Sequence, residues 1–97
     1  MLAKNGIFNA ELKPPQGKLL RCTLTLKDGI IDSVQFTGDF FLMPEDVVAK
    51  LESELEGLSI DEVAARIQGF FSAANVEMLG VAPEHFIAII ERMLTKS

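Results

Sequence analysis

The sequence predicts a two-layer α+β domain, in which a small antiparallel sheet packs against about three C-terminal helices. Apolar and polar residues alternate through three segments of the first 37 residues, as they do in strands with one buried face. From residue 44 onward the apolar residues recur every three or four positions, which is the period of an amphipathic helix. The 97 residues suit a single domain spanning residues 1–97.

The three alternating segments predict a meander of three strands. The clearest one puts apolar side chains on one face and polar ones on the other: Leu20, Cys22, Leu24 and Leu26 against Arg21, Thr23 and Thr25. The segments before and after it repeat this division, with Phe8, Ala10 and Leu12 and with Val34 and Phe36 as the apolar residues. The connections "PPQG" and "KDG" are short and rich in turn residues, so neighbouring strands are expected to be antiparallel. One face of the sheet should be buried and the other polar and open.

The first helix is expected to begin at Pro44, because proline is favoured at the first helical position. Glu45 and Asp46 would then lie in its positive first turn, and Gly57 could end it.

Two further helices are expected in the second half of the chain. One follows Ser59, whose spacing to Glu62 matches a capping box. The last opens at Pro83 and should bury one apolar face, formed by Phe86, Ile87, Ile90, Met93 and Leu94.

Composition excludes several classes of function. The formal charge is −5, and residues 38–97 carry four Lys/Arg against eleven Asp/Glu, so a nucleic acid is not an expected partner. No apolar run approaches the length that spans a membrane, and the N-terminus lacks the pattern of a secretory signal. We therefore expect no membrane segment and a cytoplasmic location.

Catalytic and metal-binding chemistry find little support in the sequence. His85 is the single histidine and Cys22 the single cysteine, so a metal site at the usual His or Cys spacing cannot be assembled from them. We expect His85 to lie partly exposed in the first turn of the last helix and Cys22 to pack as a small apolar residue. Ser59 is better explained as a helix cap than as a nucleophile. No catalytic residue is predicted.

The run "TGDFFLMPED" contains two adjacent phenylalanines, and the question is whether each ring points into the core or toward the surface. If the alternation continues from Phe36, Phe40 points inward while Asp39 and Phe41 point outward. A turn or bulge at Gly38 could reset this phase, and both rings could then be buried. The alternative is an aromatic contact that anchors another protein.

Three stretches carry a resemblance to a known family: "AELKPPQGKLLRCTLTLKDGIIDSVQFTGDFF", "PEDVVAKLESELEGLSIDEV" and "LGVAPEHFIAII". In order and spacing they resemble the C-terminal accessory domain of lipoate-protein ligases. The most specific portions are the Gly-Asp-Phe-Phe run at 38–41 and the Leu-Gly-Val run at 79–81, each with a Pro-Glu pair after it.

The resemblance implies a role in ATP-dependent protein lipoylation. In the family, lipoate is activated as lipoyl-AMP and transferred to a lysine of a lipoyl-domain acceptor protein, and a separate large domain holds the lipoate, ATP, Mg²⁺ and catalytic lysine. Some bacteria and archaea carry the accessory domain as a separate polypeptide, which is the arrangement that this chain resembles. A non-catalytic subunit that joins a ligase catalytic chain is therefore expected.

The expected partner interface combines the motif positions Gly38, Asp39, Phe40 and Phe41, carried over from the resemblance, with two charged residues. Lys18 and Arg21 are included because they are expected on the strand that presents the open face of the sheet. Two other functions remain open at this point. One is an iron–sulfur or sulfur-transfer scaffold, because the family's domain looks like the fold of such scaffolds, and the other is a binding module that kept the fold without the ligase.

Overall fold

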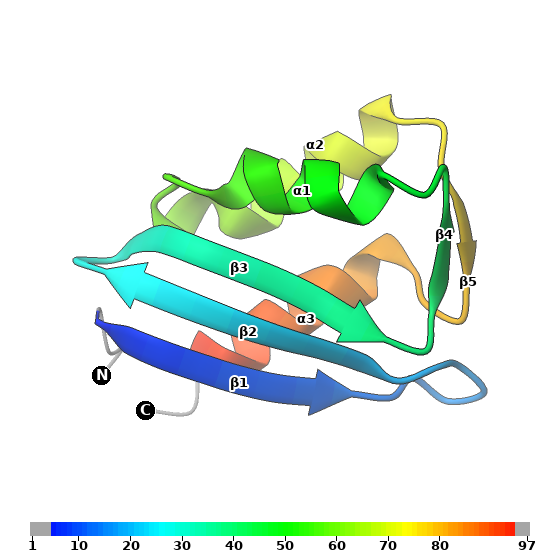
Figure 1. Cartoon of the computed structure of the whole chain (residues 1–97), viewed down its shortest axis with the longest axis horizontal. Coiled ribbons are helices and arrows are strands. Elements are labelled where there is room, and N and C mark those ends of the chain that lie inside the picture. The colour runs from blue at the N-terminus through cyan, green and yellow to red at the C-terminus, as the bar shows by residue number, and fades with distance from the viewer. Residues whose placement is uncertain (1–4, 95–97) are drawn as a thin grey trace.

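The computed structural model describes residues 5–94. The elements follow in the order β1 (Gly6–Leu12), β2 (Leu20–Lys27), β3 (Ile30–Gly38), β4 (Phe41–Met43), α1 (Val47–Leu55), the 3₁₀ turn η1 (Ile60–Glu62), α2 (Val63–Ala73), β5 (Glu77–Leu79) and α3 (Pro83–Leu94). The first three strands form one antiparallel sheet, and β4 pairs with β5 in a separate two-stranded ribbon (Figure 1). The predicted α+β class and the three-stranded meander are confirmed. The β4–β5 ribbon was not predicted.

The sheet has the two unlike faces that the alternation predicts. Its strands pair in register, so that Asn9, Thr23 and Gln35 form one row across the outer face and Glu11, Arg21 and Thr37 form the next. The inner face is buried and carries Leu20, Cys22, Leu24, Leu26, Ile31, Val34 and Phe36. A register shift between Thr25 and Leu26 keeps Ile31 on this inner face although it breaks the simple alternation.

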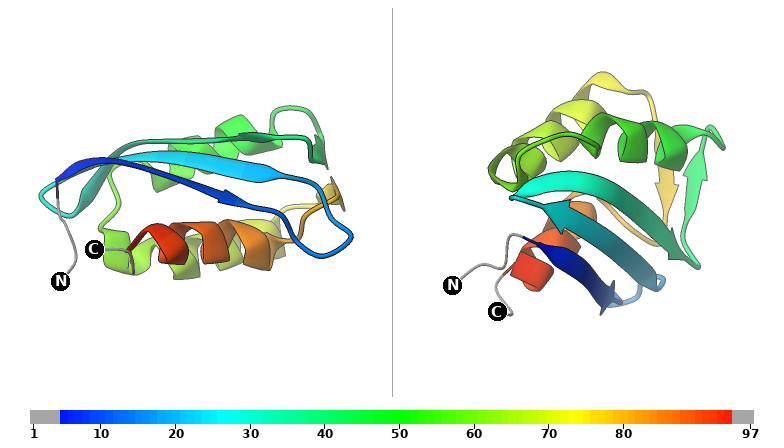
Figure 2. Two further views of the ribbon diagram at one scale, coloured as in Figure 1. Left: turned by 90° about the horizontal axis from the view of Figure 1, so that it is seen from below. Right: turned by 60° about the vertical axis from the view of Figure 1, so that its left-hand side comes forward.

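Helices α1 and α3 pack against different strands of the sheet. Helix α3 packs under β1 and β2, whereas α1 runs along β3 and α2 lies between the other two helices (Figure 2). The carboxylate of Glu52 on α1 accepts a hydrogen bond of 2.7 Å from the backbone N–H of Phe36, which ties α1 to β3. Within residues 5–94, no helix combines the length and apolar character that crossing a membrane would require.

Phe86 on α3 is the centre of the core. Its ring is fully buried and contacts Phe36 and Phe40 edge to face, with centroid distances of 4.9 and 5.7 Å. It also contacts Phe71 on α2 at 5.4 Å. The ring of Phe86 thus packs against the sheet, against a second helix and against the segment that leads into the ribbon.

The prediction that α1 begins at Pro44 was wrong. Pro44 follows directly on β4 through a cis peptide bond, and its carbonyl accepts a hydrogen bond from Val47 in a turn. The helix begins at Val47, so Glu45 and Asp46 precede its first turn. Strand β4 ends at Met43, and the turn over residues 44–46 separates it from the helix.

The other two helices follow the prediction more closely. Ser59 does cap, but its hydroxyl accepts from Asp61 at the start of η1, and α2 follows from Val63. Helix α3 begins at Pro83 as expected. Its buried face includes Ile89, which was not predicted, while Ile87 and Leu94 are only half-buried.

Candidate functional site

The β4–β5 ribbon has one face on the core and one exposed face. Its register pairs Phe41 with Leu79, Leu42 with Met78, and Met43 with Glu77. The middle pair faces the core, where Leu42 is buried and Met78 half-buried. The other two pairs point away from the core, because side chains alternate along each strand. We call these four residues (Phe41, Met43, Glu77 and Leu79) the outer face of the ribbon.

Three large apolar side chains lie exposed on this outer face. Phe41 is 54% exposed, Met43 44% and Leu79 69%. Phe41 and Leu79 stand directly opposite each other, so their side chains adjoin. Clustered apolar side chains that remain in water are typical of a surface that another protein covers.

The two adjacent phenylalanines point in opposite directions. Phe40 is half-buried and contacts Phe86, whereas Phe41 lies on the outer face of the ribbon. The expectation of one inward and one outward ring is confirmed, and the alternative in which both rings are buried is excluded.

The loop between β1 and β2 fixes the base of the ribbon. The backbone N–H of Lys18 donates to the carbonyl of Gly80, and that of Asp39 donates to the carbonyl of Leu19, at 2.8 and 3.0 Å. Gly38 has φ of +145° and packs against the Leu19 carbonyl so closely that a Cβ would clash with it. Only glycine fits there. Both strands of the ribbon are therefore held at its Phe41–Leu79 end, β4 just before it begins and β5 just after it ends.

The structure brings most of the predicted interface residues to one end of the molecule. Gly38, Asp39, Phe40 and Phe41 are consecutive, and Lys18 joins them through its bond to Gly80. Lys18 lies in the loop before β2, however, and not on the strand where it was expected. Arg21 is on the outer face of β2 as predicted, where its Nε donates a hydrogen bond of 2.8 Å to Glu11. It belongs to the sheet's polar face rather than to the ribbon.

Sequence reasoning missed half of the outer face, because it missed β5. Leu79 and Glu77 are opposite Phe41 and Met43 only through a pairing between distant parts of the chain. The segment "EML" is too short to show a period. The one sequence feature that pointed to this segment was the Leu-Gly-Val run at 79–81, which is among the portions that carry the family resemblance.

The side chains of His85 and Cys22, the single histidine and the single cysteine, are both engaged in contacts within the fold. The ring of His85 is half-buried at the start of α3, and its Nδ1 accepts from the Ala82 N–H at 2.8 Å. Burial raises the pKa of the Cys22 thiol to about 12, and the nearby Glu52 carboxylate adds to this shift. Such a thiol stays protonated at neutral pH and is a poor nucleophile or metal ligand. Across residues 5–94, no three His, Cys, Asp or Glu side chains are grouped to hold a metal ion.

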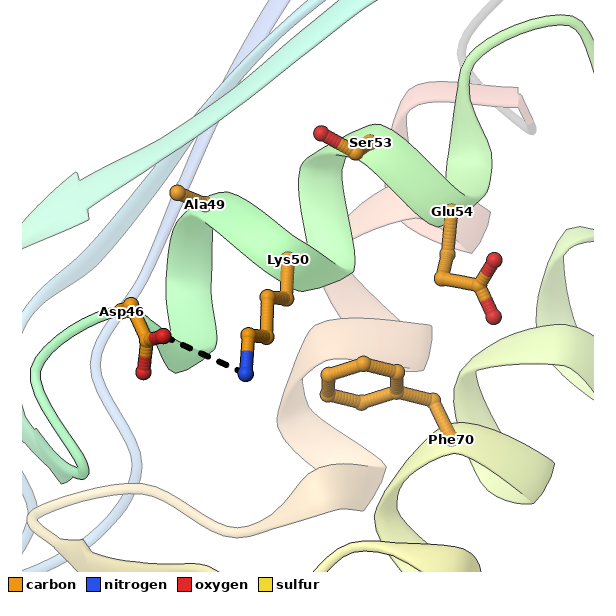
Figure 3. A pocket seen from close by; sticks show the side chains of 6 residues that line it. All are labelled: Asp46, Ala49, Lys50, Ser53, Glu54 and Phe70. Atoms are coloured by element: carbon orange, nitrogen blue, oxygen red, sulfur yellow. Dashed lines mark ion pairs between the residues drawn. The ribbon is translucent and has the colours of Figure 1, made fainter.

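A groove of about 510 Å³ lies between α1 and α2, and Figure 3 shows the side chains that line it. They are Asp46, Ala49, Lys50, Ser53, Glu54 and Phe70. Lys50 pairs with Asp46 at 3.2 Å, and Glu54 lies 3.9 Å from Arg66. These charges neutralise one another at the surface instead of converging on one point, so the groove has no arrangement suited to acid–base or nucleophilic catalysis.

Comparisons with known proteins show which family this small domain belongs to. Residues 10–90 match the family described as the bacterial lipoate protein ligase C-terminus. The chain is 39% identical over 81 residues to lipoate-protein ligase A subunit 2 of Thermoplasma acidophilum, which covers 84% of each chain.

A solved structure is similar as well. It comes from an archaeal lipoylation system of Thermoplasma acidophilum, described as a bi-partite lipoate protein ligase and its E2 lipoyl domain. The TM-score is 0.80 at 34% identity, and the match covers 88% of this chain and 94% of that one. The chain therefore belongs to the family of lipoate protein ligase C-terminal domains.

Proposed function

We propose that this chain is the non-catalytic subunit of a two-part lipoate-protein ligase and that it joins a separate catalytic chain. The observation that carries the proposal is the relative from Thermoplasma acidophilum, which is a ligase subunit and matches over most of both chains. The solved bi-partite ligase supports it with the same fold. The acceptors of the assembled enzyme would be lipoyl-domain proteins, since that structure is described together with an E2 lipoyl domain.

The outer face of the ribbon is the contact surface in this proposal. Phe41 and Leu79 would supply the apolar centre, because an aromatic residue in a desolvated contact contributes much of the affinity of an interface. Asp39 and Lys18 would lie at its margin. Gly38 and Phe40 would act indirectly, since they hold the ribbon against the loop and against Phe86. Arg21 would contribute less, because its side chain is paired with Glu11 on the sheet.

Lipoate, ATP and Mg²⁺ belong to the catalytic chain in this proposal. The described residues of this subunit offer no cluster of metal ligands, and its one histidine is engaged in a backbone hydrogen bond. The subunit would supply no reacting group. By covering the active site, it would exclude water from a reactive acyl-adenylate and hold loops of the catalytic chain in place.

An iron–sulfur or sulfur-transfer role is less well supported. Such proteins work through accessible thiolates, and Cys22 is buried in β2 with a raised pKa.

The proposal is tested by reconstitution. The catalytic chain from the same organism is assayed for lipoyl-AMP formation with and without this subunit, in the presence of lipoate, ATP and Mg²⁺. We expect the two chains to co-elute on gel filtration and the rate to rise at least about tenfold on mixing. Two chains that elute separately and a rate that does not change would contradict the proposal.

A further inference from the structure

A recess lies at the Met43 end of the ribbon's outer face. It has a volume of about 300 Å³ and is lined by Met43, Pro44, Asn75 and Glu77. Glu77 stands opposite Met43 across the ribbon, so the recess adjoins the apolar pair Phe41 and Leu79. It is thus continuous with the surface assigned to the catalytic chain.

The lining of the recess combines two apolar groups with two oxygen acceptors. Met43 and Pro44 offer a thioether and a pyrrolidine ring, while Glu77 offers a carboxylate and Asn75 an amide oxygen. Within residues 5–94, no lysine or arginine forms an ion pair with Glu77. In the described part of the chain, the carboxylate of the recess therefore has no cation as its ion-pair partner.

We propose that this recess receives the guanidinium group of an arginine from the catalytic chain, which rests on the proposed function. A planar guanidinium can donate to a carboxylate and an amide oxygen at once. Its flat faces and methylene stem pack well against groups such as the Met43 thioether and the Pro44 ring. A lysine would satisfy the carboxylate as a point charge but would leave the flat apolar walls unmatched.

The charge around the ribbon also favours a basic partner. Asp39 precedes the ribbon, Glu45 follows β4, and both side chains are exposed. Lys18, beside Gly80, is a cation at the opposite end of the outer face from the recess. An acidic margin speeds the encounter with a basic surface and makes the association sensitive to salt.

The test compares Glu77→Gln with Glu62→Gln. The first removes the charge from the recess and keeps the shape of the side chain. The second removes an exposed carboxylate from η1, whose backbone bond from Ile60 to Gly29 places it at the other end of the sheet. Binding to the catalytic chain is measured by calorimetry at low and high NaCl, and thermal melts confirm that both variants fold.

We expect Glu77→Gln to weaken binding about 10- to 100-fold at low salt and to flatten its salt dependence, while Glu62→Gln binds like the wild type. Each arginine of the catalytic chain is then changed to lysine, and one of these changes should cost no further affinity in the Glu77→Gln background. Unchanged binding by Glu77→Gln, or the absence of any coupled arginine, would overturn the inference and leave the proposed function intact. A wild-type chain that does not bind the catalytic chain would overturn both.

Discussion

The three-stranded sheet and the β4–β5 ribbon each have one face on the core, but their outward faces differ in kind. Most side chains that the sheet turns to water are polar, including the row Asn9, Thr23 and Gln35, and its exposed apolar residues are Ile7 and Ile30. The ribbon turns the apolar side chains Phe41, Met43 and Leu79 to water. A polar outward face needs no partner, whereas clustered exposed apolar residues are stabilised when another protein covers them. This contrast is why we propose the ribbon, and not the sheet, as the contact surface.

The largest expected effects on stability separate the two adjacent phenylalanines. Phe40→Ala removes a ring that packs on Phe86 and should lower the free energy of unfolding by about 2–4 kcal/mol. Phe41→Ala removes an exposed ring and should lower it by less than about 1 kcal/mol. Urea denaturation measures both. Equal losses in the two variants would mean that the ribbon's outer face is part of the core and would break the comparison.

A smaller effect is expected where α1 is tied to the sheet. Glu52→Ala leaves the Phe36 N–H without its carboxylate acceptor, so the free energy of unfolding should fall by about 1–3 kcal/mol. Glu54→Ala on the same helix is the control, because its contact with Arg66 is long and exposed, and it should change stability by less than about 0.5 kcal/mol. Both residues lie outside the ribbon, so neither change should affect binding to the catalytic chain. Unaffected binding would strengthen the contrast between the ribbon and the rest of the molecule.

The smallest effect near neutral pH concerns Cys22. Its folded pKa of about 12 is raised above the unfolded value, so the folded state holds the thiol proton more tightly. The contribution to stability is fully present well below pH 9, the ordinary pKa of the thiol, and is lost as pH rises from there toward 12, so that about 1–2 kcal/mol is lost by pH 10. Urea midpoints at pH 7 and pH 10 should differ less in Cys22→Ala than in the wild type. A thiol that reacts with a disulfide reagent in the folded protein would contradict the burial.

The sheet was predictable from sequence because strands of seven to nine residues show several full alternations. Strands β4 and β5 have three residues each and show too few, and their pairing joins segments that are far apart in the chain. The missed ribbon also bears on the misplaced start of α1, since the turn that leads out of β4 takes up residues 44–46. The phase after Phe36 offered an outward Phe41 as one of two alternatives, but nothing indicated Leu79, because no local pattern marks its strand.

The most direct measurement compares Leu79→Ser with Ile7→Ser. Both side chains are 69% exposed, but Leu79 lies on the ribbon and Ile7 on the outer face of the sheet. The affinity of each variant for the ligase catalytic chain is measured by calorimetry. The ribbon account predicts that Leu79→Ser weakens binding at least about tenfold and that Ile7→Ser leaves it unchanged. The reverse pattern, or equal losses in both variants, would contradict the assignment of the contact surface to the ribbon.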